Sequence, residues 1–194
     1  MKIHPKKIIK AILPYGIIVL HKKYNEYRKL YKKTAVNEKN VFDIILSVGV
    51  ACRATHYLKK HGLRLCANPL DWMMSYSLET VVHLYKTKFD DFFIDFVKDK
   101  EKSLEHNCHW YIDRKNKIVS MHYDNVENDS AMFRKMMKNR FEKINKLLLS
   151  ANKICFISHR NDDINVLKDF LNEMGKLYSG KITYINIRNT PPPP

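Results

Sequence analysis

The chain has 194 residues, of which 45% are hydrophobic, and this is normal for a soluble globular protein with one substantial domain. Only 5 Gly and 7 Pro occur, which excludes long low-complexity linkers. The formal net charge is +15, and residues 1–33 contribute most of it, with ten Lys and Arg against one acid. Because the charge is concentrated there and no recognition motif accompanies it, we do not expect nucleic-acid binding.

The four cysteines form no C-x-x-C pair and have no zinc-ligand spacing, so we expect a reduced, cytoplasmic protein without a metal site. No glycine-rich phosphate loop is present, and we expect no cofactor. The composition predicts three parts: a basic amphipathic N-terminal segment at 1–40, a single α/β domain at 41–190 and a proline tail at 191–194.

Residues 5–33 hold a short apolar run, 11–20, with lysine clusters on both sides. Ten apolar residues cannot span a bilayer as a helix, and no small-residue cleavage site follows them. Two interpretations remain. The segment binds an anionic membrane surface, at the inner face of the membrane, or it is a helix that docks on the domain with a solvated basic face.

An apolar strand is predicted at 42–48, with a break at Gly49 and a helix that starts near Cys52 and ends at Gly62. A cysteine in the first turn of a helix is stabilised as a thiolate, because the unpaired backbone N–H groups and the helix dipole favour negative charge. Cys52 is therefore a candidate nucleophile. The alternative is a small apolar residue buried at a strand-to-helix junction.

A second helix is predicted from Asp71, as its N-cap, to about Tyr85, with Trp72 packing this helix against the cysteine helix. Aromatic residues at helical spacing predict a further structural helix over 89–97. Residues 108–122 read as a hairpin that ends at His122, and a long helix is expected from about Ser130 to Leu149.

The last part of the domain reads as strand, helix and strand, at 154–158, 163–174 and 182–187. This pattern predicts a mixed, partly parallel sheet covered by helices, an α/β fold, with an α+β papain-like fold as the alternative.

His122 is the preferred base for Cys52, because it ends a strand from a different element and is followed by Asp124. The alternative is an exposed histidine at a hairpin end. Arg64, His159 and Arg160 are candidates for binding an anionic substrate, since Arg160 follows a strand where open sheets commonly bind ligands. The arginines could equally serve the scaffold, capping helix carbonyls for example.

Several segments together resemble a bacterial family of putative papain-like cysteine peptidases, a domain of unknown function. These segments, within about residues 42–190, are SVGVACRATHYLKKHGLR, NPLDWMMSYSLE, FFIDF, MHYD, RFEKINKLL and KICFISHR. The positions that match the family pattern are Ser47, Gly49, Cys52, Gly62, Leu63, Arg64, Pro69, Asp71 and Trp72. The chain departs from the pattern at Val48, Ala51, Leu70 and Tyr123, and Tyr123 separates His122 from Asp124.

The resemblance implies a hydrolase or acyltransferase with Cys52 as nucleophile, His122 as base and Asp124 beside it, and with Asp71 and Trp72 as scaffold. Its substrate would be a peptide or a glycan-linked group. The basic leader is similar to leaders of bacterial surface-glycan modifying proteins, so the first alternative is a peripheral-membrane transferase or accessory protein of surface-polysaccharide synthesis that binds an anionic sugar donor. The second alternative is a non-catalytic interaction module.

Overall fold

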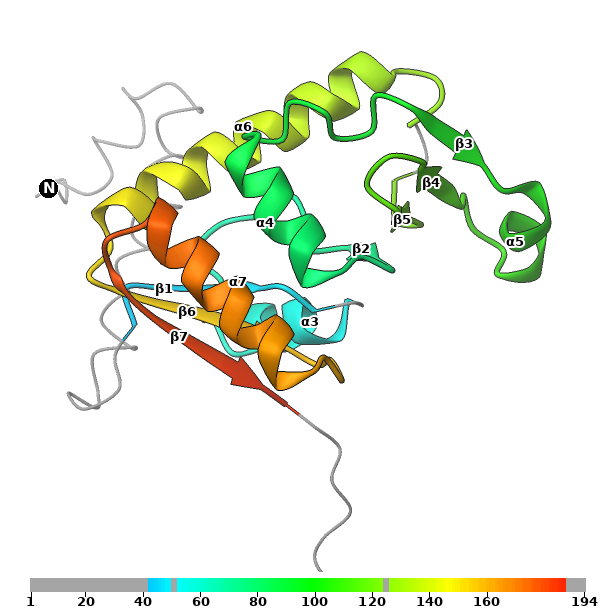
Figure 1. The fold of residues 1–194 in the computed structure, drawn as a ribbon. Helices are drawn as coiled ribbons and strands as arrows, with labels where there is room; N and C mark the ends of the chain where they lie inside the picture. The colour runs from blue at the N-terminus through cyan, green and yellow to red at the C-terminus, as the bar shows by residue number, and fades with distance from the viewer. Residues whose placement is uncertain (1–41, 50–51, 124–125, 188–194) are drawn as a thin grey trace, which may run out of the picture. The chain divides into compact units, whose positions relative to one another are not determined.

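The structure is a computed structural model that describes residues 42–49, 52–123 and 126–187. Five helices and seven strands lie within these ranges, in one parallel and one antiparallel sheet (Figure 1). The predicted fold class, α/β with partly parallel strands and helices, is confirmed. The predicted N-terminal segment and the proline tail lie outside the described residues, and the domain boundary near residue 41 stays a prediction.

The parallel sheet has the order β1-β6-β7, with β6 in the centre. Its strands are β1 (Ile44–Ser47), β6 (Lys153–Ser158) and β7 (Lys181–Asn186), and β6 is joined to β7 by α7 (Ile164–Leu177). Ile154 and Phe156 belong to the main hydrophobic core, whereas Cys155, between them, points to the opposite face because side chains alternate along a strand. The predicted strand–helix–strand unit is confirmed.

The antiparallel sheet has the order β2-β5-β4-β3. Its strands are β2 (Met73–Met74), β3 (Phe96–Lys98), β4 (Tyr111–Asp113) and β5 (Ile118–Ser120). The hairpin predicted at 108–122 is β4 and β5, with shorter strands. A short helix, α5 (Lys100–Glu105), connects β3 to β4 and buries none of its residues.

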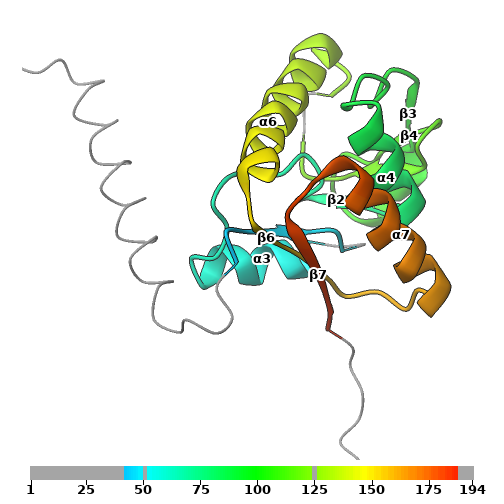
Figure 2. The ribbon, with the colours of Figure 1, turned by 60° about the vertical axis from the view of Figure 1, so that its left-hand side comes forward.

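The hydrophobic core combines many aromatic rings with aliphatic side chains, and α6 (Ser130–Ser150) contributes one whole face to it. This helix buries the face formed by Phe133, Met137, Phe141, Ile144 and Leu148. It meets α4 (Leu78–Lys86) through Tyr85, whose ring centroid is 5.6 Å from that of Phe141. Figures 1 and 2 both show α4 beside α7, so these helices share the space above the parallel sheet.

The helix predicted from Asp71 to Tyr85 is wrong in its first half. Residues 73–74 form β2, which pairs with β5, and Ser75 has a positive φ of 61°. The helix α4 begins only at Leu78, where the Ser77 side chain accepts a hydrogen bond from the Thr80 N–H at 3.1 Å. Strand pairing and a serine cap therefore override the helical periodicity of this segment.

The helix predicted at 89–97 is also wrong, because most of this segment is a tight turn followed by β3. Lys88, Phe89 and Phe93 all have positive φ angles, between 53° and 60°. The Phe93 N–H donates to the buried carboxylate of Asp113 at 2.8 Å, a bond that a helix would not permit. The aromatic spacing reports burial of the rings, which this turn achieves without a helix.

None of the helices in the described part of the chain is both long and apolar enough to cross a membrane.

Candidate functional site

Cys52 is the N-cap residue of α3 (Arg53–Lys60) and is half-buried. Its φ and ψ are −63° and −9°, and its carbonyl accepts the first helical hydrogen bond from the His56 N–H at 2.8 Å. No acidic residue lies in the first turn of α3. The thiol therefore lies at the end of the helix that favours negative charge, as the sequence predicts.

The helix α3 ends at a turn that reverses the chain toward the start of the helix. Gly62 has a φ of 69°, and the Leu63 N–H donates to the Leu58 carbonyl at 2.9 Å. Helices commonly end at a residue in the left-handed backbone conformation, and glycine adopts this conformation without steric cost. The turn leads directly to Arg64, whose side chain contacts the next part of the site.

Asp71 is buried, with an exposed fraction of 2%, and its carboxylate joins three segments of the chain. It accepts hydrogen bonds from Arg64 Nε at 2.7 Å, from the Asn68 N–H at 2.8 Å and from Thr55 Oγ1 at 3.2 Å, and it also forms an ion pair with Arg64. Burial raises the pKa of the Asp71 carboxyl, although Arg64 and the hydrogen bonds lower it in part. Asp71 is thus not the helix N-cap that the sequence predicts, but a buried anchor.

Two of these contacts fix the chain on both sides of Cys52. Thr55 lies in α3, three residues after the cysteine, and bonds to Asp71. Asn68 donates from Nδ2 to the carbonyl of Ser47, the last residue of β1, at 3.0 Å. The loop at 64–72 is therefore attached both to the strand before Cys52 and to the helix after it.

Trp72, the residue next to Asp71, contacts His122. The two ring centroids are 5.5 Å apart, at an interplanar angle of 65°. The pairing of β2 with β5 sets this contact, because Met73 lies opposite Ser120 and the two rings flank that pair. His122 itself is exposed. Consecutive residues thus contact the cysteine helix on one side and the predicted base on the other.

A hydrophobic pocket of about 620 Å³ opens beside His122. It is lined by His122, Tyr123, Val126, Asn128, Asp129, Met132, Phe133 and Met136. Arg140 holds Tyr123 in place through a hydrogen bond to the phenol oxygen at 2.5 Å and lies 5.6 Å from the centre of the ring. The pocket can accept an apolar group next to the imidazole.

Arg160 is buried and its guanidinium is bound within the protein. It donates to the carbonyl of Tyr76 at 2.7 Å and forms an ion pair with Asp162. Its backbone N–H donates to Asn186 at the end of β7. His159, beside it, is half-buried, and its Nε2 is buried without a hydrogen-bond partner in the described residues. Both lie just past the carboxyl end of β6, the position predicted from the sequence.

The structure therefore joins α3, the helix that Cys52 caps, to the Arg64–Asp71 pair through Thr55, and it places Trp72 against His122. Asp124, the predicted carboxylate partner, lies outside the described residues. Within the ranges that the structure describes, no three His, Cys, Asp or Glu side chains could hold a metal ion. Sequence reasoning missed Thr55, Asn68 and the pocket beside His122. Only Asn68 had a signal, since it precedes Pro69 in a polar, non-helical stretch.

Comparison with known proteins gives one match. Residues 43–180 match the model of a family described as putative papain-like cysteine peptidases. Neither the curated proteins nor the solved structures contain a match to the chain. The matched range contains Cys52, Asp71, Trp72 and His122. The family match does not test the predicted roles in glycan synthesis and membrane binding, which stay predictions.

Proposed function

This chain belongs to the family of putative papain-like cysteine peptidases, and on that premise we propose that it is a cysteine hydrolase or acyltransferase with Cys52 as nucleophile and His122 as base. The observation that carries the proposal is the contact chain through residues 71 and 72. Asp71 bonds to Thr55 in the cysteine helix, and the Trp72 ring packs on His122. Two neighbouring residues thus contact the helix that begins at the proposed nucleophile and the imidazole of the proposed base, which supports the proposal.

In the proposed reaction His122 accepts the thiol proton and the Cys52 sulfur attacks the acyl carbon of an amide or ester. The carbonyl oxygen becomes an oxyanion, for which the unpaired backbone N–H groups at the start of α3 are the proposed donors. Collapse expels an amine or alcohol, which takes the proton from His122. Water or another acceptor then attacks the thioester and returns the thiol. Asp124 is the proposed group that orients His122.

The pocket beside His122 supports a place for the substrate in this reaction. Its exposed wall includes Met132, which is 68% exposed, and Met136 from the next turn of α6. Methionine side chains are flexible and polarisable and adapt to ligands of different shape. We place an apolar group of the substrate there, next to the acyl carbon. The predicted roles of Arg64, His159 and Arg160 in substrate binding stay proposals, and the guanidinium contacts of the two arginines favour a scaffold role.

The test uses the reactivity of individual thiols in the folded protein. Iodoacetamide labelling at pH 7, followed residue by residue by mass spectrometry, should modify Cys52 faster than Cys66 and Cys108. Burial raises the pKa of Cys66, and it raises that of Cys155 to about 11, so Cys155 serves as the slow internal reference. The variant His122→Gln should slow the labelling of Cys52 alone.

Turnover is tested with p-nitrophenyl acetate, which releases p-nitrophenol in a burst when a nucleophile is acetylated. The concentration of p-nitrophenol released in the burst should equal the protein concentration, and an acetyl group should remain on Cys52. It should vanish in Cys52→Ser and persist in the matched control Cys108→Ser. If Cys52 is labelled no faster than Cys66 and Cys108, or if Cys52→Ser keeps the burst, the nucleophile assignment is wrong.

A further inference from the structure

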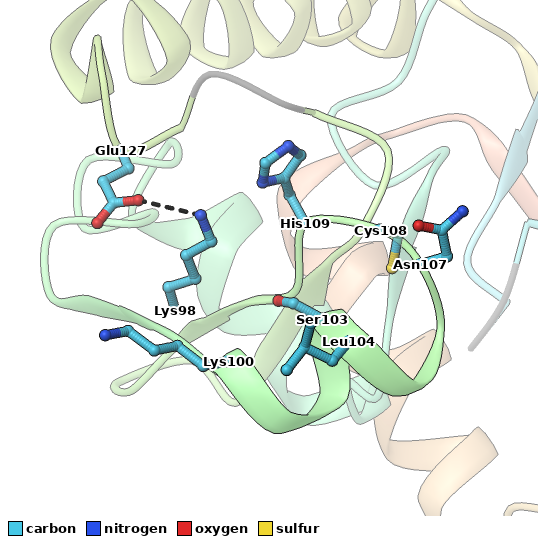
Figure 3. Close-up of a pocket in the computed structure, with 8 residues that line it drawn as sticks. All are labelled: Lys98, Lys100, Ser103, Leu104, Asn107, Cys108, His109 and Glu127. Atoms are coloured by element: carbon cyan, nitrogen blue, oxygen red, sulfur yellow. Dashed lines mark hydrogen bonds and ion pairs between the residues drawn. The ribbon is translucent and has the colours of Figure 1, made fainter.

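A second pocket, of about 740 Å³, lies between α5 and the start of β4 and shares no lining residue with the pocket beside His122. Its walls are formed by Lys98, Lys100, Ser103, Leu104, Asn107, Cys108, His109 and Glu127 (Figure 3). Residues 100, 103, 104 and 107 follow helical spacing, so one face of α5 and its C-terminal turn form one wall. The volume is within the range of small-molecule sites, about 300–1,000 Å³.

The charge of this pocket is positive. Two lysines line it against a single carboxylate, Glu127, and the His109 ring offers a further N–H donor. Lys100 makes no hydrogen bond or ion pair in the described residues, and the Lys98 ammonium lies 3.4 Å from Glu127, a long contact to a side chain that is 57% exposed. An exposed ion pair of this kind is weak, so an anionic ligand can displace Glu127 from the Lys98 ammonium.

The side chains of Lys98 and His109 are held in place by one buried ring. Lys98 lies opposite Tyr111 in the pairing of β3 with β4, and its ammonium is 5.7 Å from the ring centre. The His109 ring stacks on the same tyrosine, with centroids 6.2 Å apart at 11°. Tyr111 is 1% exposed, so its position is fixed by the core. Figure 3 shows the Lys98 side chain extending toward Glu127, with the His109 ring to one side of this pair.

We propose that this pocket binds a small molecule that carries a phosphate group. Phosphate oxygens replace the Glu127 carboxylate on Lys98 and accept further hydrogen bonds from Lys100 and His109, which suits a group with several acceptor oxygens. Because Tyr111 already orders two of the donors, less conformational entropy is lost on binding. Leu104, which is 84% exposed on the pocket wall, contacts the apolar part of the ligand. The proposal does not depend on Cys52 or His122.

The experiment is a titration of the full-length, ¹⁵N-labelled protein with inorganic phosphate, exchanged for chloride at constant ionic strength. Amide signals of residues 98–109 should shift and saturate. The variants Lys98→Gln and Lys100→Gln should each weaken binding about tenfold, whereas Glu127→Gln should tighten it because a competing carboxylate is removed. Lys146→Gln, an exposed lysine on α6 and the charge-matched control, should leave the affinity unchanged. Phenyl phosphate should bind more tightly than phosphate, and Leu104→Ser should abolish that difference.

Chemical shifts that do not saturate would show general charge screening and overturn the proposal. The same conclusion would follow if Lys146→Gln weakened phosphate binding as much as Lys98→Gln and Lys100→Gln do. Weaker binding by Glu127→Gln would also contradict it, because the carboxylate would then be part of the site. Circular dichroism of each variant separates loss of binding from loss of folding. The variant Cys52→Ser should bind phosphate as the unmodified chain does, so this result stands apart from the test of the nucleophile.

Discussion

Asp71 shows how a single side chain can carry both stability and the geometry of the site. Its carboxylate is 2% exposed and receives hydrogen bonds from Thr55, Arg64 and Asn68, which belong to three different parts of the chain. A buried carboxylate is costly unless it is paired, so Arg64 contributes mainly by compensating this charge. The side chain of Arg64 is itself 19% exposed, which keeps part of its own solvation.

Arg64→Met should lower the free energy of unfolding by about 3 kcal/mol, because it leaves the Asp71 carboxylate buried without its cation. Thr55→Val, which removes only the hydrogen bond from a neutral hydroxyl to the same carboxylate, should cost less, about 1.5 kcal/mol. Urea denaturation followed by circular dichroism measures both. An Arg64→Met variant that is no less stable than Thr55→Val would show that the ion pair does not compensate the buried charge.

Among the elements, the turn at 87–95 depends most on contacts from elsewhere in the chain. Asp113, at the end of β4, accepts hydrogen bonds from the backbone N–H groups of Phe93, Lys115 and Asn116 and from the Asn116 side chain. Asp113 is fully buried, and its carboxylate connects the turn at 87–95 to the β4–β5 hairpin. The positive φ angles of this turn are therefore offset by tertiary contacts rather than by local sequence.

Asp113→Ala should lower the free energy of unfolding by about 3 kcal/mol, because it leaves several buried N–H donors without an acceptor. Asp95→Ala is the control, since the Asp95 side chain is 60% exposed and forms an ion pair with the exposed Arg114. Its effect should stay within about 0.5 kcal/mol. Thermal and urea denaturation of the two variants compare them directly, and equal effects would show that burial of the Asp113 carboxylate is not what matters.

Asp91, in the same turn, gives stability a defined pH dependence. Burial alone would raise the pKa of its carboxyl, but hydrogen bonds from Lys115 and His83 lower it below the usual value. An acid with a lowered pKa stabilises the folded state above its unfolded pKa, about 4, and this contribution is lost as pH falls through the folded pKa.

Asp91→Asn should therefore cost about 1 kcal/mol of unfolding free energy at pH 7, a small value because Lys115 is exposed and His83 is partly exposed. The cost should shrink as the pH falls below about 4, where the carboxyl of the unmodified chain becomes protonated. Urea denaturation at a series of pH values measures the difference between the two proteins. A difference that stays constant down to low pH would rule out the ionised carboxylate as its source.

Helices and strands were predictable where local sequence and tertiary packing agree. The periodicity of α6 and its start near Ser130 are confirmed, as are Gly62 at the end of α3 and the strands β6 and β7. The helices predicted over 71–77 and 89–97 were wrong, because a strand pairing sets the backbone conformation of the first segment and a buried aspartate that of the second. Neither partner is close in sequence, so no local pattern reports it.

The site was predictable in part for the same reason. The position of Cys52 at a helix start follows from a strand, a break and a helix that are adjacent in sequence. The contact between Trp72 and His122 spans fifty residues and depends on the pairing of β2 with β5, which the sequence did not predict. The role of Asp71 was mistaken because an aspartate before a hydrophobic run is usually an N-cap.

At the scale of the domain, the central strand of the parallel sheet and the helix α5 differ in how deeply they are buried. The central strand β6 pairs on both sides and contains four fully buried residues, Ile154, Cys155, Phe156 and Ser158. The helix α5, between β3 and β4, buries no residue. The stability of the chain should therefore be lowest at α5 and highest at β6.

Native-state hydrogen exchange in low urea tests this order. Amides of β6 should exchange only through global unfolding, so their exchange free energy should fall steeply with urea. Amides of α5 should exchange through local opening that exposes little surface and should be insensitive to urea. A steep urea dependence at α5 would show instead that this helix unfolds together with the core.

The chain has two tryptophans, and each lies against a histidine ring: Trp72 against His122, and Trp110 stacked on His106 at 4.9 Å. An imidazole in ring contact with an indole can quench its fluorescence. In Trp110→Phe, the emission of the single remaining indole should therefore rise when His122 is also replaced by Gln, because the ring contact is lost. The scaffold that holds the proposed base would thereby serve as an optical reporter of the contact with that base.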